Sequence, residues 1–135
     1  MNESAKILVL GGVISLLYGT ITGWWLFWNM KKNKGKGDRY IWATHKASLW
    51  LGFMIFGIAF VINHLQFSET VLIALSWGLN VGCLLVLIGQ TILGIKRNPN
   101  LFTNPSPLAA TLTGIGDIII MAVIILILYG VIVYL

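Results

Sequence analysis

Two histidines are the side chains in this sequence best suited to binding a metal or moving a proton near neutral pH. His45 lies in the run Trp42–Lys46, and His64 follows nineteen residues later. In a helix this separation is about 28 Å, so the two imidazoles cannot hold one ion together. Ser48 and Gly52 share the helical face of His45, and Gly52 leaves space there for a large, flat group. A lone histidine near a helix end is more often an interfacial hydrogen-bonding residue than a ligand of a metal or haem, and both interpretations stay open.

Other polar residues recur on one face of a predicted helix over 71–95. With Leu87 filling one gap, they follow a 4–3–4–3 spacing: Ser76, Asn80, Cys83 and Gln90. This spacing places them on a face toward the bundle, with Asn80 about 13 Å into the span. Two explanations stay open, namely hydrogen bonds between helices and a pocket or relay that these residues line. Cys83 is the single cysteine of the sequence, which excludes an internal disulfide.

Asp117 is a carboxylate inside an apolar segment. The eighteen residues 118–135 that follow it span about 27 Å as a helix. We therefore expect Asp117 at the membrane boundary, paired with Lys46 or capping the backbone. The small and polar stretch 111–116 is interpreted as an irregular segment that leads into this helix.

The elements that position these residues follow from the composition. The chain has 135 residues, of which 58% are hydrophobic and only 10% charged, and its mean hydropathy is +0.90. A soluble domain carries about 25% charged residues and could not bury this much apolar surface. The net charge of +5 does not indicate nucleic-acid binding, because the lysines and arginines cluster between membrane-length apolar runs. The sequence therefore predicts an integral membrane protein that works in or at the lipid bilayer.

Four segments are long and apolar enough to span a bilayer. The predicted fold is all-α, a four-helix membrane bundle forming a single domain over 1–135, with helices at about 7–28, 41–62, 71–95 and 108–135. The first segment carries a ridge of small residues at four-residue spacing, Gly11, Ser15, Gly19 and Gly23. Such a ridge lets a neighbouring helix approach closely.

The connections predict the orientation. Residues 29–40 hold five Lys or Arg, 96–107 open with Lys96 and Arg97, and the turn 63–70 has Glu69 and no basic residue. Basic loops stay in the cytoplasm, so we expect connections 29–40 and 96–107 there, in the cell inner (plasma) membrane, with both termini outside. An aromatic belt is expected on the cytoplasmic side, formed by Trp24, Trp25, Trp28, Tyr40 and Trp42.

From residue 42 onward the sequence resembles a family of small four-span membrane isomerases, which comprises styrene oxide isomerase and hydroxylaminobenzene mutase. Three stretches carry the resemblance: Ala43-Thr44-His45 with Gly52 seven residues on, Trp77-Gly78-Leu79-Asn80-Val81-Gly82, and the loop from Asn98-Pro99 to Pro105 leading into Gly116-Asp117-Ile118.

The resemblance implies a homotrimer that binds haem b near its subunit interfaces, with His45 as the axial iron ligand and Ser48 and Gly52 beside the cofactor. Ferric haem would act as a Lewis acid that rearranges a small apolar epoxide to a carbonyl compound, or a hydroxylaminoarene to an aminophenol, without net redox change. Asn80 is the candidate catalytic residue near the pocket. An apolar pocket suits this chemistry because water would trap the cation formed on ring opening.

Two positions depart from the family. The family commonly has Asn six residues after the ligand histidine, where this chain has Leu51. The styrene oxide branch has Tyr four residues after the Asn of the third helix, where this chain has Leu84. With Ser76 and Cys83, these two leucines form the expected substrate pocket. Their apolar character fits either a more apolar substrate or a haem protein without isomerase activity.

Three functions stay open from the sequence. The first is the haem-dependent isomerase, and the second is a non-catalytic haem or small-ligand-binding membrane protein such as a gas sensor. The third is a small transporter or assembly subunit without a cofactor. Proton-coupled small multidrug transporters depend on a membrane-embedded carboxylate that is usually Glu, and here Glu3 and Glu69 lie outside the spans. Homo-oligomerisation is expected, because four helices are too few to enclose a haem and also shield the polar face.

Overall fold

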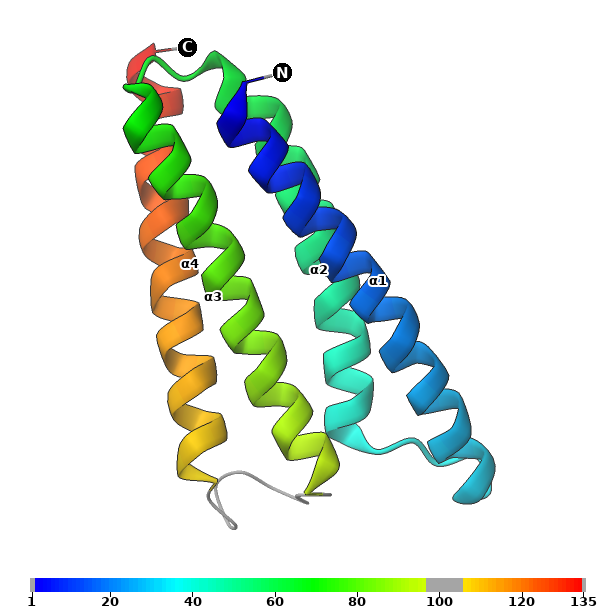
Figure 1. The fold of residues 1–135 in the computed structure, drawn as a ribbon. Coiled ribbons are helices and arrows are strands. Elements are labelled where there is room, and N and C mark those ends of the chain that lie inside the picture. The colour runs from blue at the N-terminus through cyan, green and yellow to red at the C-terminus, as the bar shows by residue number, and fades with distance from the viewer. Residues whose placement is uncertain (1, 97–105, 135) are drawn as a thin grey trace.

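Four long helices make up the chain in a computed structural model that describes residues 2–96 and 106–134. They are α1 (Glu3–Lys32), α2 (Arg39–Val61), α3 (Glu69–Ile95) and α4 (Pro107–Tyr134), and α2 continues into the short 3-10 turn η1 (Ile62–His64) (Figure 1). The described residues contain no strand. The predicted all-α fold is confirmed, and each helix is long and apolar enough to cross a membrane.

Side-chain oxygens fix where three of the helices begin. The side chain of Asn2 accepts a hydrogen bond from the backbone N–H of Ala5, and that of Ser68 accepts one from the N–H of Val71. The side chain of Asp38 accepts from the N–H groups of Tyr40 and Ile41, the second and third residues of α2. Short polar residues of this kind are the usual helix N-caps, because the first-turn N–H groups have no partner within the helix.

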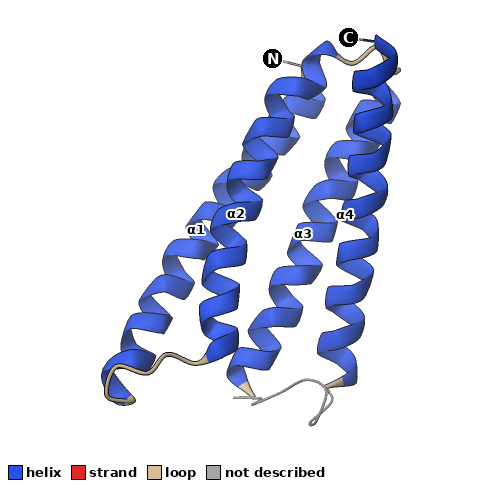
Figure 2. Cartoon of the chain, turned by 180° about the vertical axis from the view of Figure 1, so that it is seen from behind, coloured by secondary structure: helices blue, strands red, loops and turns tan. Residues whose placement is uncertain are grey.

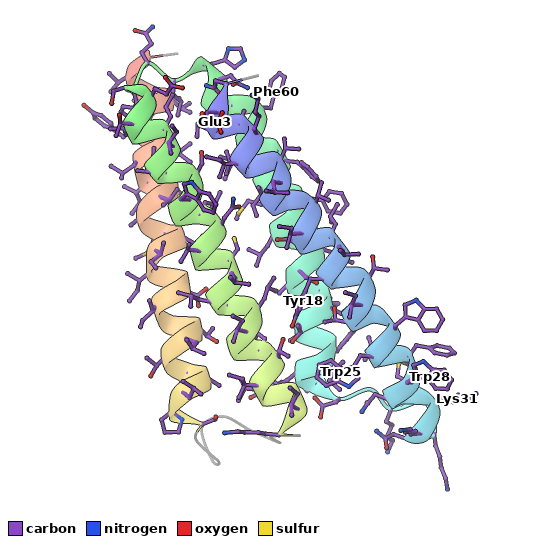
Figure 3. The ribbon with its side chains drawn as sticks, in the orientation of Figure 1. Glu3, Tyr18, Trp25, Trp28, Lys31 and Phe60 are labelled. Atoms are coloured by element: carbon purple, nitrogen blue, oxygen red, sulfur yellow. The ribbon has the colours of Figure 1, made fainter. Side chains whose placement is uncertain are left out.

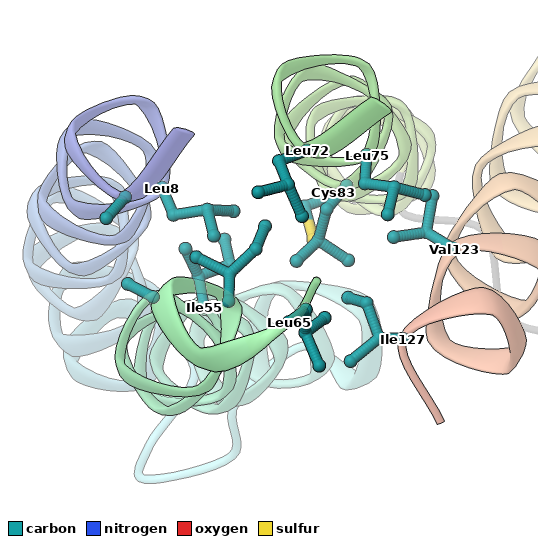
Figure 4. Packing of buried hydrophobic residues seen from close by; sticks show 12 residues of the cluster. Leu8, Ile55, Leu65, Leu72, Leu75, Cys83, Val123 and Ile127 are labelled. Carbon is teal, nitrogen blue, oxygen red and sulfur yellow. The ribbon is translucent and has the colours of Figure 1, made fainter. Parts of the chain in front are cut away.

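The helices form two antiparallel pairs. α1 packs along α2 and α3 packs along α4, and the pairs meet where α3 contacts both α1 and α2 (Figures 1 and 2). The main core lies toward the end of the bundle that holds both termini, where η1 and Leu65 close over it. Its buried members come from all four helices and include Leu8, Ile55, Leu65, Leu72, Leu75, Cys83, Val123 and Ile127 (Figure 4).

Small residues bring the backbones close within each pair. A Cβ at Gly52 of α2 would lie 3.2 Å from the carbonyl oxygen of Gly12 on α1. A Cβ at Gly116 of α4 would lie 2.6 Å from the carbonyl oxygen of Gly82 on α3. The predicted small-residue ridge of α1 is confirmed as a surface of close approach, because its glycines face side chains of α2 and α3.

The two basic connections leave the same end of the bundle. Lys32, Arg39, Ile95 and Pro107 all lie opposite the two termini (Figure 1). Trp25 and Trp28 lie near this end, as the predicted aromatic belt requires (Figure 3). Arg97 lies outside the described residues, and so does the loop from Asn98 to Pro105, which is part of the third stretch that resembles the isomerase family.

Candidate ligand site at His45

The His45 imidazole on α2 points at the backbone of α1. Its Nδ1 lies 2.9 Å from the carbonyl oxygen of Gly19. A carbonyl can only accept, so Nδ1 is the protonated nitrogen of the ring and donates this hydrogen bond. In the neutral imidazole, Nε2 then keeps its lone pair and is the nitrogen able to bind a metal.

Glycine at position 23 lets the ring take this place. A Cβ at Gly23 would lie 2.9 Å from Cε1 and 3.1 Å from Nδ1 of His45, which is closer than side chains normally approach. On the other side, Trp42 stacks against the ring, with 6.1 Å between centroids and 15° between planes. The imidazole is therefore held by a hydrogen bond to α1 and by the ring of Trp42.

A groove between α1 and α2 opens beside this imidazole. Its volume is about 460 Å³, within the range of roughly 300–1,000 Å³ found for small-molecule sites. We call it the His45 groove, and its lining is Thr20, Gly23, Trp24, Phe27 and His45. Trp24 and Phe27 are 63% and 58% exposed and contact each other edge to face, so the groove opens on the outer surface of the bundle beside this aromatic pair.

These residues fit a haem better than a bare ion. A metal-bound histidine almost always donates its other ring nitrogen to a carbonyl or carboxylate, which is the arrangement of His45 and Gly19. Among the described residues, no group of three or more His, Cys, Asp or Glu could chelate an ion. A cofactor that brings most of its own ligands, and needs one imidazole and an apolar surface, matches the donor set.

Gly52 and Ser48 do not line this groove. A Cβ at Gly52 would lie 2.8 Å from Cδ2 of Leu16, so α1 fills the space that the sequence assigned to a flat group. That expectation is wrong, because the missing side chain serves the contact between α1 and α2. Ser48 is fully buried and donates a hydrogen bond to the carbonyl of His45 in its own helix.

Asn80 lies in a different groove, between α1 and α3. This Asn80 groove has a volume of about 230 Å³ and is lined by Ile7, Leu10, Gly11, Ile14, Trp77, Asn80, Val81 and Leu84. The side-chain Nδ2 donates to the carbonyl of Ile7 at 2.9 Å, and the buried Oδ1 has no partner among the described residues. Asn80 packs against Gly11 and His45 against Gly23, and twelve residues of α1 correspond to about 18 Å. The single pocket expected from the sequence is therefore two separate grooves within one chain.

The other residues of the expected substrate pocket do not lie together: one lines the Asn80 groove, and the others are in or near the buried interior of the bundle. Leu84 lines the Asn80 groove, whereas Leu51 packs against the main core and Cys83 belongs to it. Ser76 is fully buried and donates to the carbonyl of Leu72. The polar face of α3 thus points into the bundle as predicted, but it does not form one substrate pocket.

Asp117 lies deeper in its helix than the sequence predicted. α4 is helical from Pro107, so Asp117 follows ten residues, or about 15 Å, of regular helix. The prediction of an irregular segment at 111–116 is wrong. These residues are helical and pack closely on α3 through Gly116. Asp117 is exposed and forms no ion pair with any described residue. The expected partner, Lys46, instead places its Nζ 4.6 Å from the ring centroid of Trp42.

Gly19, Gly23, Trp24 and Phe27 are site residues that the sequence reasoning missed. It assigned the two glycines to helix packing and Trp24 to the aromatic belt. A usable signal was present, because α1 and α2 are joined by a short connection and run antiparallel. In such a helical hairpin, a residue that precedes the connection on α1 lies at about the same depth as a residue that follows it by a similar number of positions on α2.

No protein-family model, curated protein or solved structure matches this chain.

Proposed function

We propose that this protein is a haem b-dependent membrane isomerase in which His45 would hold the iron. The observation that carries the proposal is the hydrogen bond from His45 Nδ1 to the Gly19 carbonyl. It leaves Nε2 as the free ring nitrogen beside an apolar groove. The sequence motifs that resemble the styrene oxide isomerase family support the same assignment of His45.

The residues of the His45 groove have distinct roles in this proposal. His45 would bind the iron, and the Gly19 carbonyl holds the ring in one tautomer and orientation. A ferric haem held there would supply Lewis-acid chemistry toward the oxygen of a small apolar epoxide or a hydroxylaminoarene. Trp24 and Phe27 would provide an apolar surface for the cofactor and for an apolar substrate.

A second candidate is a non-catalytic haem or small-ligand-binding protein. It is favoured by the lining of the His45 groove, which offers no acidic or basic side chain besides His45 itself. Asn80, the polar residue expected to assist catalysis, lies about 18 Å away along α1. Turnover separates the isomerase from a non-catalytic haem protein, since both of these bind haem.

The proposed assembly is a homotrimer, as the resemblance implies. It lies in the plasma membrane with the basic end of the bundle in the cytoplasm. The mass of the purified protein–detergent complex, corrected for detergent, tests the number of copies.

The cofactor is tested by visible spectra of wild type, His45→Ala and His64→Ala, purified in mild detergent with and without added haem. His64 is the matched control because it is exposed and lies in η1, beyond the end of α2 that is far from His45. We expect a Soret band in wild type and His64→Ala that is lost in His45→Ala.

A wild type that stays without a Soret band after haem is added contradicts the isomerase and the haem-binding form of the second candidate, and leaves only a protein that binds a small ligand without haem. If haem binds, the loaded wild type is incubated with styrene oxide and with phenylhydroxylamine. Formation of the aldehyde or the aminophenol supports the isomerase. No product from a range of apolar epoxides and hydroxylaminoarenes leaves the non-catalytic haem protein as the function.

A further inference from the structure

Asp117 presents a carboxyl group on the outer face of α4, well inside a membrane-spanning helix. It is exposed and lies ten residues from the start of a 28-residue helix. Two turns of apolar or small residues precede it, and the apolar stretch 118–133 follows. Its neighbour Gly116 packs on Gly82, which is at the middle of α3. The carboxyl group therefore faces outward near the centre of the hydrophobic span.

A carboxyl group is costly in this place unless it has a partner. Ionisable side chains inside membranes almost always face a protein interior and pair with another group. The described part of this chain supplies no partner, because Asp117 has no ion pair or hydrogen bond there. Most of the basic residues lie near the helix ends, and Lys46 contacts Trp42. The partner must come from outside the single chain.

The exposed face around Asp117 has the spacing of a helix-pairing surface. Six exposed residues recur at intervals of 4, 3, 4, 3 and 4, and we call them the α4 seam: Ala110, Gly114, Asp117, Met121, Ile124 and Leu128. This is the spacing of helices that pack in parallel along one stripe. A Cβ at Gly114 would meet nothing within 4 Å, and small residues four apart, here Ala110 and Gly114, allow close approach of a second helix.

We propose that the α4 seam packs against the same seam in a second copy of this chain, and that Asp117 hydrogen-bonds to the partner subunit's Asp117. A protonated carboxyl group is both a donor and an acceptor, so it is complementary to its own copy. Cyclic symmetry places the same position of parallel α4 helices side by side around its axis, in a pair of copies and equally in the proposed homotrimer. One polar residue within an apolar seam fixes the register of such a pair. This contact does not depend on haem binding.

Cysteine cross-linking tests the contact. Gly114→Cys and Gly57→Cys are compared in a Cys83→Ala background, in lipid at low protein density. Gly57 is the matched control, because it is an exposed glycine on α2 whose Cβ would also meet nothing within 4 Å. We expect a disulfide-linked dimer with Gly114→Cys and little with Gly57→Cys. Equal cross-linking at the two positions, whether high or low, overturns the proposal.

The role of Asp117 is tested in the Gly114→Cys protein. Asp117→Asn keeps a group that donates and accepts hydrogen bonds, whereas Asp117→Leu removes it. We expect Asn to retain the dimer and Leu to reduce the cross-linked fraction by between about threefold and about eighteenfold, which corresponds to the average and the maximum for hydrogen bonds between membrane helices. Undiminished cross-linking with Leu overturns the pairing of the carboxyl groups. A haem spectrum of the same samples is an independent readout, so failure of this contact and failure of the proposed function are distinguishable.

Discussion

At the scale of single residues, the glycines of α1 determine where the His45 imidazole lies and what it bonds to. Gly23 leaves room for the imidazole, and the neighbouring Gly19 offers its carbonyl to Nδ1. Gly52 lies on the face of His45 but is covered by Leu16. Three glycines that look equivalent in the sequence therefore have two different functions, which depend on what the opposing helix places against each.

Gly23→Ala should weaken haem binding. The added Cβ would lie 2.9 Å from Cε1 of His45, so the imidazole must move away from the Gly19 carbonyl. Loss of an outer-shell partner costs roughly 10- to 100-fold in metal affinity, and we expect a change of that size in a haem titration. Gly57→Ala is the control, because its Cβ meets nothing. Unchanged affinity in Gly23→Ala would show that iron does not bind to His45 in this orientation.

At the scale of helices, hydrogen bonds supplement apolar packing between α1 and α3. The hydroxyl of Tyr18 lies 2.6 Å from Oγ1 of Thr91, and Thr91 donates its own proton to the carbonyl of Leu87. Tyr18 is therefore the donor of the bond between the helices. Asn80 makes a second link through the carbonyl of Ile7. These two bonds fix the depth of α1 relative to α3.

Tyr18→Phe should destabilise the protein by about 0.6–1.7 kcal/mol, the average and maximum for hydrogen bonds between membrane helices. The ring stays, so the loss reports the hydroxyl alone. Unfolding by denaturant in mixed micelles measures it for Tyr18→Phe, for Thr91→Val and for the double variant. If the bond is present, the double variant costs less than the sum of the single variants. Strict additivity would mean that the two hydroxyls do not interact.

At the scale of the whole molecule, the two ends of the bundle differ in charge. The end with connection 29–40 carries Lys31, Lys32, Lys34, Lys36 and Arg39, and Lys31 lies over the ring of Trp28. The opposite end, at residues 63–70, has Glu69 and no Lys or Arg in its connection. An excess of basic residues at one end sets the orientation of a membrane protein.

Lys36→Cys and Gln66→Cys should therefore label from opposite sides of the membrane. Both positions are exposed and lie in the connections at the two ends. In a Cys83→Ala background, we expect a membrane-impermeant maleimide to label Gln66→Cys in intact cells and Lys36→Cys only in inverted vesicles. The reverse pattern would place the basic end outside and contradict the orientation predicted from charge.

The sequence by itself determined the class of protein, the number of spans and the polar face of α3. These follow from local properties, because bilayer thickness sets the length of an apolar run and helical periodicity sets its faces. The prediction that His45 is a ligand also came from the sequence, through its local motif, and it stays a prediction.

Only the tertiary structure decided which residues meet. It separated Asn80 from His45, brought Gly19 and Gly23 to the imidazole, and assigned Gly52 to the packing of α1 on α2. It also moved Asp117 from the expected boundary to the interior of an unbroken helix. The reason is that a glycine, a lone histidine or a carboxylate has the same local pattern in a packing contact and in a site. The depth and rotation of the opposing helix distinguish the two, and these are set by contacts between residues far apart in the chain.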